Sequence, residues 1–280
     1  MRHIVILVHR HGAFDNSGYF LYELAKLWEA GGIKVTVQRG PGATHDADLA
    51  ISHVDLTVVP PDHASYLRQY RRALNGEVID ISKRRISSAI LRRGEKYDGP
   101  VIVKTNCNSG GLREAWLLKH KSLPRRIAAK LRNRLPWTMR AQLPTHSYPI
   151  FPNAAAVPRA VWLNPDLVVE RFLCEQRDGF YCLRTWVFLG DRETNSLSYS
   201  PSPIIKGANV VRREAVHEVP AELRKIRAEM GFDYGKFDYG IVDGRVVLYD
   251  ANRTPTLGRF KREEILPRLE FLAEGIRYFE

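Results

Sequence analysis

The stretch that decides the fold is Lys236-Phe-Asp-Tyr-Gly-Ile-Val-Asp-Gly-Arg-Val-Val-Leu-Tyr-Asp-Ala-Asn-Arg-Thr-Pro255. Runs rich in β-branched and aromatic residues lie on both sides of the dipeptide Asp243-Gly244, which is a strong signal for a β-hairpin. Asp250 and Asn252 are two residues apart, so their side chains leave the same face of the second strand. We therefore expect a hairpin that carries a cluster of hard oxygen ligands.

The position of Asp238 depends on how this hairpin turns. A strict two-residue loop at 243 and 244 pairs Asp238 with Tyr249 and points it away from Asp250. A three-residue loop or a β-bulge pairs Asp238 with Asp250 directly, and this is the arrangement that we predict. Mg²⁺ binds few protein carboxylates and fills its other positions with water and phosphate oxygens, so Asp238, Asp250 and Asn252 are the predicted metal ligands. The alternative is a polar-faced hairpin whose carboxylates are only solvated.

Two segments further upstream contain residue types that suit a nucleotide. Residues 101–111 read Val-Ile-Val-Lys-Thr-Asn-Cys-Asn-Ser-Gly-Gly, an apolar strand that ends in a cation and runs into a glycine turn. Such a turn can lay backbone N–H groups over phosphate oxygens. The predicted phosphate contacts are Lys104, Ser109, Gly110 and Gly111. A second strand at 167–173 places Glu170 among apolar residues, where a carboxylate needs a partner such as an adenine amino group or ribose hydroxyls.

The order of these segments resembles the ATP-grasp superfamily. A lysine strand, a glycine loop, a Val-Val-Glu-Arg-Phe-Leu segment and an Asp … Asp-x-Asn set near a proline follow one another within roughly residues 77–258. Within the superfamily the chain is similar to the branch of D-alanine:D-alanine ligase and the ribosomal-protein glutamate ligase. The resemblance implies an α/β fold with a small parallel-sheet N-terminal domain at 1–81, a central subdomain at 82–165 and a C-terminal subdomain at 166–280. ATP would lie enclosed between the two subdomains.

The resemblance also implies which residues contact the nucleotide. Lys83 and Lys104 would contact its phosphates, and Glu170 with the backbone around Leu173 would hold adenine. The carboxylate that contacts the ribose would be Glu175 or Asp178.

The chemistry that the resemblance implies is that of an ATP- and Mg²⁺-dependent carboxylate–amine ligase. The γ-phosphate would pass to an acceptor carboxylate, and an amine or other nucleophile would then take the acyl phosphate. Lys206 and Asn209 would lie near the γ-phosphate, and Arg184 would face the carboxylate of a small-molecule or peptide acceptor, expected to be anionic. The alternative is an ATP-grasp small-molecule kinase that releases a phosphorylated anionic acceptor.

The first eighty residues alternate between strand and helix patterns, which predicts a small and mainly parallel sheet. The expected elements are strands at 3–8, 33–37, 48–59 and 77–81 and helices at 18–31 and 62–74. Ligands of such sheets bind beyond the carboxyl ends of the strands, so the segment His9-Arg-His-Gly-Ala-Phe-Asp-Asn-Ser17 is a candidate acceptor site. The two histidines are either acceptor contacts or a general base, or incidental residues of a polar loop.

Positive charge is concentrated at 112–150, where nine Lys or Arg residues accompany one acid, so that +8 of the chain's net +12 lies there. Apolar residues recur every four positions from Leu123 to Leu135, which predicts an amphipathic basic helix. Three interpretations are open: a lid over a polyanionic substrate, a membrane-surface helix across 119–140, or a solvated insertion. No interleaved aromatic platform accompanies the charge, so a nucleic-acid partner is not expected.

Length and composition agree with a cytoplasmic nucleotide enzyme. A chain of 280 residues, 44% of them hydrophobic, is long enough for two or three compact units. The three cysteines are odd in number and lack metal-binding spacing, which indicates a reducing compartment. The apolar start at 4–8 is too short for a signal peptide or a membrane span. No Walker-type phosphate loop occurs, and the glycines at 40–45 fail the dinucleotide fingerprint.

Overall fold

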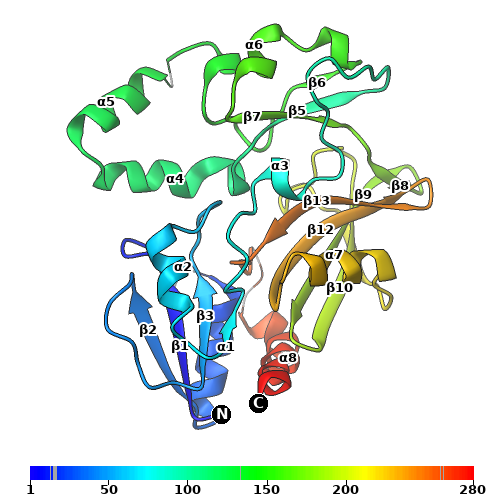
Figure 1. The fold of residues 1–280 in the computed structure, drawn as a ribbon. Helices are drawn as coiled ribbons and strands as arrows, with labels where there is room; N and C mark the ends of the chain where they lie inside the picture. The colour runs from blue at the N-terminus through cyan, green and yellow to red at the C-terminus, as the bar shows by residue number, and fades with distance from the viewer. Residues whose placement is uncertain (13, 15–17, 133, 259, 261) are drawn as a thin grey trace.

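Three β-sheets with helices packed around them make up the computed structural model, which describes residues 1–12, 14, 18–132, 134–258, 260 and 262–280. Figure 1 shows the N-terminal part of the chain at the lower left, the central part at the top and the C-terminal part at the right. None of the described helices is long and apolar enough to cross a membrane.

The N-terminal sheet has the strand order β2-β1-β3-β4, and every pairing in it is parallel. Its elements are β1 (His3–Val8), α1 (Phe20–Ala30), β2 (Lys34–Arg39), β3 (Leu49–His53), α2 (Pro61–Leu67) and β4 (Ala73–Leu74). The strand β1 is an unbroken apolar run because helices and loops cover both faces of a parallel sheet. The small parallel sheet predicted from the sequence is confirmed.

Two elements predicted for this region are wrong. The helix expected at 62–74 ends at Leu67, and 73–74 form the edge strand β4. The strand expected at 77–81 is not formed, and Asp80 makes only an isolated bridge to Val58. The reason lies at Asn75, which is buried with φ of 54° and bonds the backbone of Asp233 and Tyr234. These contacts turn the chain toward the C-terminal part and away from its own sheet.

The central part contains a three-stranded antiparallel sheet of order β6-β5-β7. Its elements are α3 (Lys83–Ile86), β5 (Val101–Thr105), η1 (Asn108–Gly111), α4 (Leu112–Leu117), η2 (Leu118–His120), α5 (Leu123–Arg132), η3 (Trp137–Met139), β6 (Ile150–Phe151), η4 (Ala154–Ala156), α6 (Arg159–Leu163) and β7 (Leu167–Arg171). The sheet packs on its own apolar cluster, which includes Val101, Val103, Val161 and Val169. The predicted basic helix is α5, and it ends at Arg132.

The C-terminal part is built on a six-stranded antiparallel sheet with the order β11-β10-β9-β12-β13, in which β8 also pairs with β9. Its elements are β8 (Glu175–Arg177), β9 (Phe180–Leu189), β10 (Arg192–Ser200), β11 (Arg212–Ala215), α7 (Ala221–Glu229), β12 (Tyr234–Val242), β13 (Arg245–Asn252), α8 (Arg262–Ala273) and η5 (Glu274–Phe279). The strands β12 and β13 are the hairpin expected from the sequence.

The register of this hairpin brings two carboxylates together. Asp243 and Gly244 form a two-residue turn with φ of 51° and 75°, so Val242 pairs with Arg245. A β-bulge after Asp238 then shifts the register by one residue, and Asp238 pairs with Asp250 instead of Tyr249. The predicted pairing is therefore confirmed, and the bulge is its cause.

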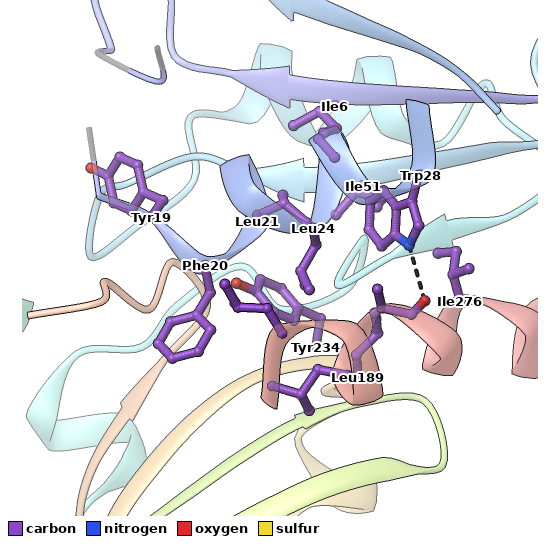
Figure 2. Packing of buried hydrophobic residues seen from close by; sticks show 14 of the residues in the cluster. Ile6, Tyr19, Phe20, Leu21, Leu24, Trp28, Ile51, Leu189, Tyr234 and Ile276 are labelled. Atoms are coloured by element: carbon purple, nitrogen blue, oxygen red, sulfur yellow. Dashed lines mark hydrogen bonds between the residues drawn. The ribbon is translucent and has the colours of Figure 1, made fainter. Parts of the chain in front are cut away.

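The N-terminal and C-terminal parts share one apolar core, which Figure 2 shows from close by. Leu21, Leu24 and Trp28 of α1 pack against Leu189 of β9 and Tyr234 of β12. The Trp28 indole Nε1 donates a hydrogen bond of 2.9 Å to the carbonyl of Ala273 at the end of α8. The two ends of the chain therefore form a single packed base.

Arg253, directly after β13, fastens the same two parts by polar contacts. Its side chain is fully buried, and the guanidinium donates hydrogen bonds to four backbone carbonyls. The acceptors are the carbonyl oxygens of Val54, Leu56, Thr57 and Val78. Burial lowers the pKa of Arg253 to about 10, still well above neutral pH, so the charge is retained.

Candidate active site

A cavity of about 180 Å³ lies between the central sheet and the C-terminal sheet. Nine of the site residues predicted from the sequence line this cavity. Those from the central part are Lys83, Lys104, Ser109, Gly110 and Glu170, and those from the C-terminal side are Leu173, Lys206, Asp238 and Asp250. The cavity therefore brings together, from distant parts of the chain, most of the residues singled out in the sequence.

One wall of the cavity is the strand pair β5 and β7. Their antiparallel register places Ile102 opposite Glu170, and Lys104 lies on the same face two residues further along. The Lys104 Nζ is 2.6 Å from Glu170 Oε2, and Glu170 is only 1% exposed. Glu170 Oε1 is buried without a hydrogen-bond partner among the described residues. A buried carboxylate oxygen of this kind calls for a donor, which a bound ligand can supply.

The opposite wall is the hairpin with its two facing carboxylates. Lys83 forms an ion pair with Asp250, and Lys236 Nζ lies 2.7 Å from Asp238 Oδ2. Thr185 Oγ1 donates a further hydrogen bond of 2.9 Å to Asp238. Burial opposes protonation of Lys83 and Lys236, but the attraction of the neighbouring carboxylates outweighs it and raises the pKa of both lysines. Each carboxylate is therefore balanced by a lysine that stays charged.

The hairpin offers the donor types that Mg²⁺ prefers. Asp238 and Asp250 face each other, and Asn252 lies two residues along on the same face of β13. The Asn252 side-chain oxygen accepts a hydrogen bond of 2.9 Å from the Thr254 backbone N–H. Within the described part of the chain, no three His, Cys, Asp or Glu side chains are arranged to hold a metal. Two carboxylates and an amide oxygen fit a magnesium ion whose other ligands are phosphate and water.

The glycine turn has the backbone that its residues predict. Ser109, Gly110 and Gly111 have φ of 48°, 67° and 74°, which is the left-handed region that favours glycine. A Cβ at Gly110 would lie 2.6 Å from the Thr145 side chain, so no larger residue fits there. Ser109 and Gly110 line the cavity, whereas Gly111 precedes α4 and its carbonyl accepts a hydrogen bond from Gln142.

The cavity also has an apolar lining. Ile102, Phe172, Leu173, Cys174 and Tyr249 line it together with the lysines and carboxylates. A lining of both kinds suits a ligand that combines an aromatic ring with anionic groups.

Besides Gly111 and Asn252, four predicted site residues do not line this cavity. Glu175 accepts hydrogen bonds of 2.8 and 2.9 Å from Arg184 and one from the Ile241 backbone N–H, and both side chains are at most 5% exposed. Burial acts to raise the pKa of Glu175, but Arg184 and the N–H group lower it below its ordinary value. Side chains alternate along a strand, so Arg184 lies on the face of β9 opposite to Leu183 and Thr185. Those two residues line a neighbouring cavity, and Arg184 does not.

The other two, Asp178 and Asn209, have structural contacts of their own. Asp178 lies in the turn between β8 and β9 with φ of 51° and pairs with Arg212 at 3.3 Å on the surface. The Asn209 side chain donates to the Ile204 carbonyl and accepts from the Lys206 backbone N–H, each at 2.8 Å. Asn209 therefore shapes the turn that presents Lys206.

Thr145 and Tyr148 also line the cavity, although no sequence motif had singled them out. Both lie near the end of the basic insertion, and their segment folds back onto the glycine turn and onto Thr105, whose hydroxyl is 3.4 Å from that of Tyr148. No local pattern encodes this long-range return.

A second and larger cavity of about 750 Å³ opens beside the first. The two cavities share Lys206, Asp238 and Asp250, and Asn252 lines only the second. Three arginines, Arg212, Arg213 and Arg268, also line the second cavity. His9 and His11 lie elsewhere, in a separate cavity beyond the carboxyl end of β1.

A small parallel-sheet unit with two further units that enclose a lysine-lined cavity defines the ATP-grasp fold, and this chain adopts it. The fold expected from the sequence is thus confirmed. No protein-family model matches the chain, and neither does any curated protein.

Several solved structures are similar to this chain in fold. The RiPP-associated ATP-grasp ligase of Chryseobacterium gregarium, in complex with ADP and a leader and core peptide, has a TM-score of 0.51 at 9% identity, over 98% of this chain and 96% of that one. The RimK domain ATP-grasp protein of Sphaerobacter thermophilus has 0.48 at 12% identity, over 98% of both chains. D-alanine–D-alanine ligase of Bacillus anthracis has 0.43 at 12% identity, over 100% of this chain and 98% of that one.

Proposed function

We propose that the protein is an ATP-dependent, ADP-forming ligase that joins an acceptor carboxylate to an amine or another nucleophile. The observation that carries this proposal is the junction of the two cavities at Lys206, Asp238 and Asp250. A nucleotide in the first cavity with its phosphates at the lysines would present its γ-phosphate to an acceptor in the second. The ADP and peptides in the structure of the Chryseobacterium ligase support this use of the fold.

The lysines of the first cavity would supply the positive charge that phosphoryl transfer needs. Lys83 is buried and Lys104 is half-buried, and their present partners are the carboxylates Asp250 and Glu170 respectively. Nucleotide phosphates would take over these cations, and Glu170 would then be free to accept hydrogen bonds from adenine or ribose. When Mg²⁺ is bound at Asp238, Asp250 and Asn252, it would neutralise charge on the β- and γ-phosphates.

The second cavity favours an anionic acceptor. Its three arginines are accompanied by Ser196 and Ser198, whose side chains leave the same face of the sheet as Thr185. A carboxylate held by arginine is fixed in orientation as well as in place. The γ-phosphate would pass to that carboxylate, and the nucleophile would displace phosphate from the acyl phosphate.

The test is a turnover assay of candidate carboxylates with Mg-ATP and hydroxylamine. A ligase should form a hydroxamate together with ADP and free phosphate. Asp250→Asn should abolish this turnover, because it removes a carboxylate from the junction of the cavities. Asp243→Asn is the matched control, since it makes the same change in the exposed hairpin turn, where asparagine tolerates the left-handed backbone.

A kinase would give a different result in the same assay. Its phosphate would remain on the acceptor, no nucleophile would be needed, and no hydroxamate would form. Phosphorus NMR that shows a stable phosphorylated acceptor without free phosphate would overturn the ligase proposal in favour of phosphotransfer.

A further inference from the structure

A cavity of about 220 Å³ lies beyond the carboxyl end of β1, away from the nucleotide cavity and the second cavity, with which it shares no lining residue. Its lining residues are His9, Arg10, His11, Asp62, His63, Leu117, His120 and Lys121. Four histidines thus meet from three separate segments of the chain. We call this group the histidine cavity.

The four imidazole rings form two stacked pairs. His9 lies parallel to His63 with ring centroids 5.4 Å apart, and His11 lies parallel to His120 at 3.9 Å. The lone pairs of an imidazole nitrogen lie in the ring plane, so stacked rings do not direct them at one ion. No metal-binding group of side chains is found in the described residues either. The arrangement therefore argues against a metal and for donors spread around a larger ligand.

His63 has an open hydrogen-bonding position. It is 4% exposed, and its Nδ1 is 2.8 Å from Asp62 Oδ1. Because an ionised carboxylate only accepts, Nδ1 carries a proton, and Nε2 is the acceptor nitrogen of the neutral ring, which lines the cavity. Nε2 is buried without a hydrogen-bond partner among the residues that the structure describes. A buried polar atom of this kind indicates a missing partner.

His9 has the complementary arrangement. Its Nδ1 accepts a hydrogen bond of 3.2 Å from the His11 backbone N–H, so its other ring nitrogen, Nε2, carries the proton in the neutral form. His9 is therefore a donor, whereas His63 Nε2 accepts when neutral and donates when protonated.

The charges around the histidine cavity are unbalanced. Arg10 and Lys121 are permanent cations, and the single acid, Asp62, is bound to His63. Burial, together with the nearby His63, His11 and Lys121, lowers the pKa of His9 to about 4. An anion in the cavity would relieve this crowding of positive groups.

We propose that the histidine cavity binds a phosphate-type dianion, either inorganic phosphate or a phosphate monoester. Four oxygens and two negative charges match the two permanent cations and the ring of imidazole nitrogens better than one carboxylate does. The protonated oxygen of hydrogen phosphate can donate to neutral His63 Nε2, and its other oxygens can accept from Lys121 and His9. This inference rests on the histidine cavity alone and not on the ligase proposal.

The test is NMR of the full chain with isotope-labelled histidine rings, titrated with sulfate, inorganic phosphate and phenyl phosphate. We expect saturable shifts of the His9 and His63 resonances. Sulfate keeps both charges between pH 6 and 8, so any change in its affinity over this range comes from the protein and not from ionisation of the ligand. Tighter binding of phenyl phosphate than of phosphate would identify an esterified ligand, and the reverse would identify free phosphate.

Variants make the assignment specific. His63→Gln and Lys121→Gln should each weaken sulfate binding by about tenfold, the effect of one charge-assisted hydrogen bond. His217→Gln removes an exposed histidine elsewhere, and Lys206→Gln removes a cation of the nucleotide cavity. Both should leave the shifts of His9 unchanged. If His63→Gln does not fold, His9→Asn serves in its place.

Three results would overturn the proposal. One is the absence of saturable shifts in the parent protein at millimolar sulfate and phosphate. Another is anion binding that persists in full in the His63→Gln and Lys121→Gln variants but disappears in Lys206→Gln, which would place it in the nucleotide cavity. The third is stoichiometric binding of Zn²⁺ by the four histidines without any response to anions.

Discussion

Lys104 and Glu170 form a largely buried ion pair in the wall of the cavity between the central and C-terminal sheets, with side chains 16% and 2% exposed. Removing one partner of such a pair leaves an uncompensated buried charge. Lys104→Met should therefore lower the free energy of unfolding by about 3 kcal/mol, in addition to weakening ATP by about 2 kcal/mol. Urea unfolding and calorimetric titration with ATP measure the two effects separately.

A double variant separates structure from binding at this site. Lys104→Met with Glu170→Gln removes both charges, so most of the lost stability should return while ATP binding stays weak. Lys96→Met, which replaces an exposed lysine, is the control. If Lys104→Met unfolds like the control, the ion pair does not hold the cavity together.

His53 predicts a pH dependence of stability. It is 2% exposed, neither of its ring nitrogens has a partner among the described residues, and the edges of aromatic rings surround it. Burial lowers its pKa to about 4, whereas an unfolded histidine titrates near about 6.5. The unfolded chain therefore binds a proton first as the pH falls, and stability is lost between about pH 6.5 and pH 4.

The size of that loss follows from the shift. The neutral His53 contributes about 3 kcal/mol of stability, which is present in full above about pH 6.5 and lost as the pH falls to about 4. The phenylalanine ring of the His53→Phe variant cannot be protonated. Between about pH 6.5 and pH 4, the free energy of unfolding of this variant should therefore fall by about 3 kcal/mol less than that of the parent protein. Urea unfolding at several pH values compares the two proteins. Parallel curves for both would show that His53 is not the titrating group.

At the scale of single elements, the hairpin β12–β13 was largely predictable. Asp243-Gly244 favours a left-handed two-residue turn by its own conformational preferences, and the flanking residues favour strands. The bulge after Asp238 has no such local signature, so the sequence left two registers open, and the structure has the one that faces Asp238 toward Asp250.

The side of β9 on which Arg184 lies was not predictable. Both faces of β9 are covered, so its side chains lack the alternation of polar and apolar residues that would reveal which face is which. The partner of Arg184 is Glu175, whose strand pairs with β9 through an adjacent turn. A charged residue in a strand therefore says little about the site until its face is known. The predicted end of the helix α2 was wrong for a related reason, because Asn75 is held by hydrogen bonds to the distant C-terminal part.

The helix α5 has an apolar face without a covering element among the described residues. Leu123, Ile127 and Leu131 are 65%, 48% and 58% exposed. Changing the basic residues beside this face, Arg125, Arg126 and Lys130, to Gln should alter the free energy of unfolding by less than about 0.5 kcal/mol per residue. Arg132 is kept because it forms an ion pair with Asp166.

The same triple variant tests the three interpretations of the basic insertion. A lid over an acidic substrate predicts a raised KM for the acceptor, and the effect should fade at high salt. A membrane-surface helix predicts loss of binding to anionic vesicles with KM unchanged. A solvated insertion predicts neither change, and kinetic and vesicle-sedimentation measurements distinguish the three.

At the scale of the whole molecule, the shared core predicts that the two ends of the chain unfold together. Leu269 of α8 is fully buried in that core, which also contains β1 and α1 of the N-terminal part. Leu269→Ala should lower the free energy of unfolding by about 3 kcal/mol. Hydrogen exchange should then rise in β1 as well as in β9 and β12.

A control and a contrary result are available for this prediction. Leu163→Ala makes the same change at a side chain that is 57% exposed in α6 and should have little effect. Faster exchange in the C-terminal strands without any change in β1 would show that the two ends of the chain are independent units.

The hydrogen bonds of Arg253 determine which part of the molecule can move. They tie the end of the hairpin to four carbonyls of the N-terminal part, and the shared core holds the same two parts together. The central sheet has a separate apolar cluster. The helices of the central part meet this base through ion pairs such as Lys83 with Asp250 and Arg113 with Asp55, and through Ile86, which packs in an apolar cluster of the C-terminal part. We therefore expect the cavity between the two sheets to open by rotation of the central sheet about its two chain connections, while the N-terminal and C-terminal parts keep their relative positions.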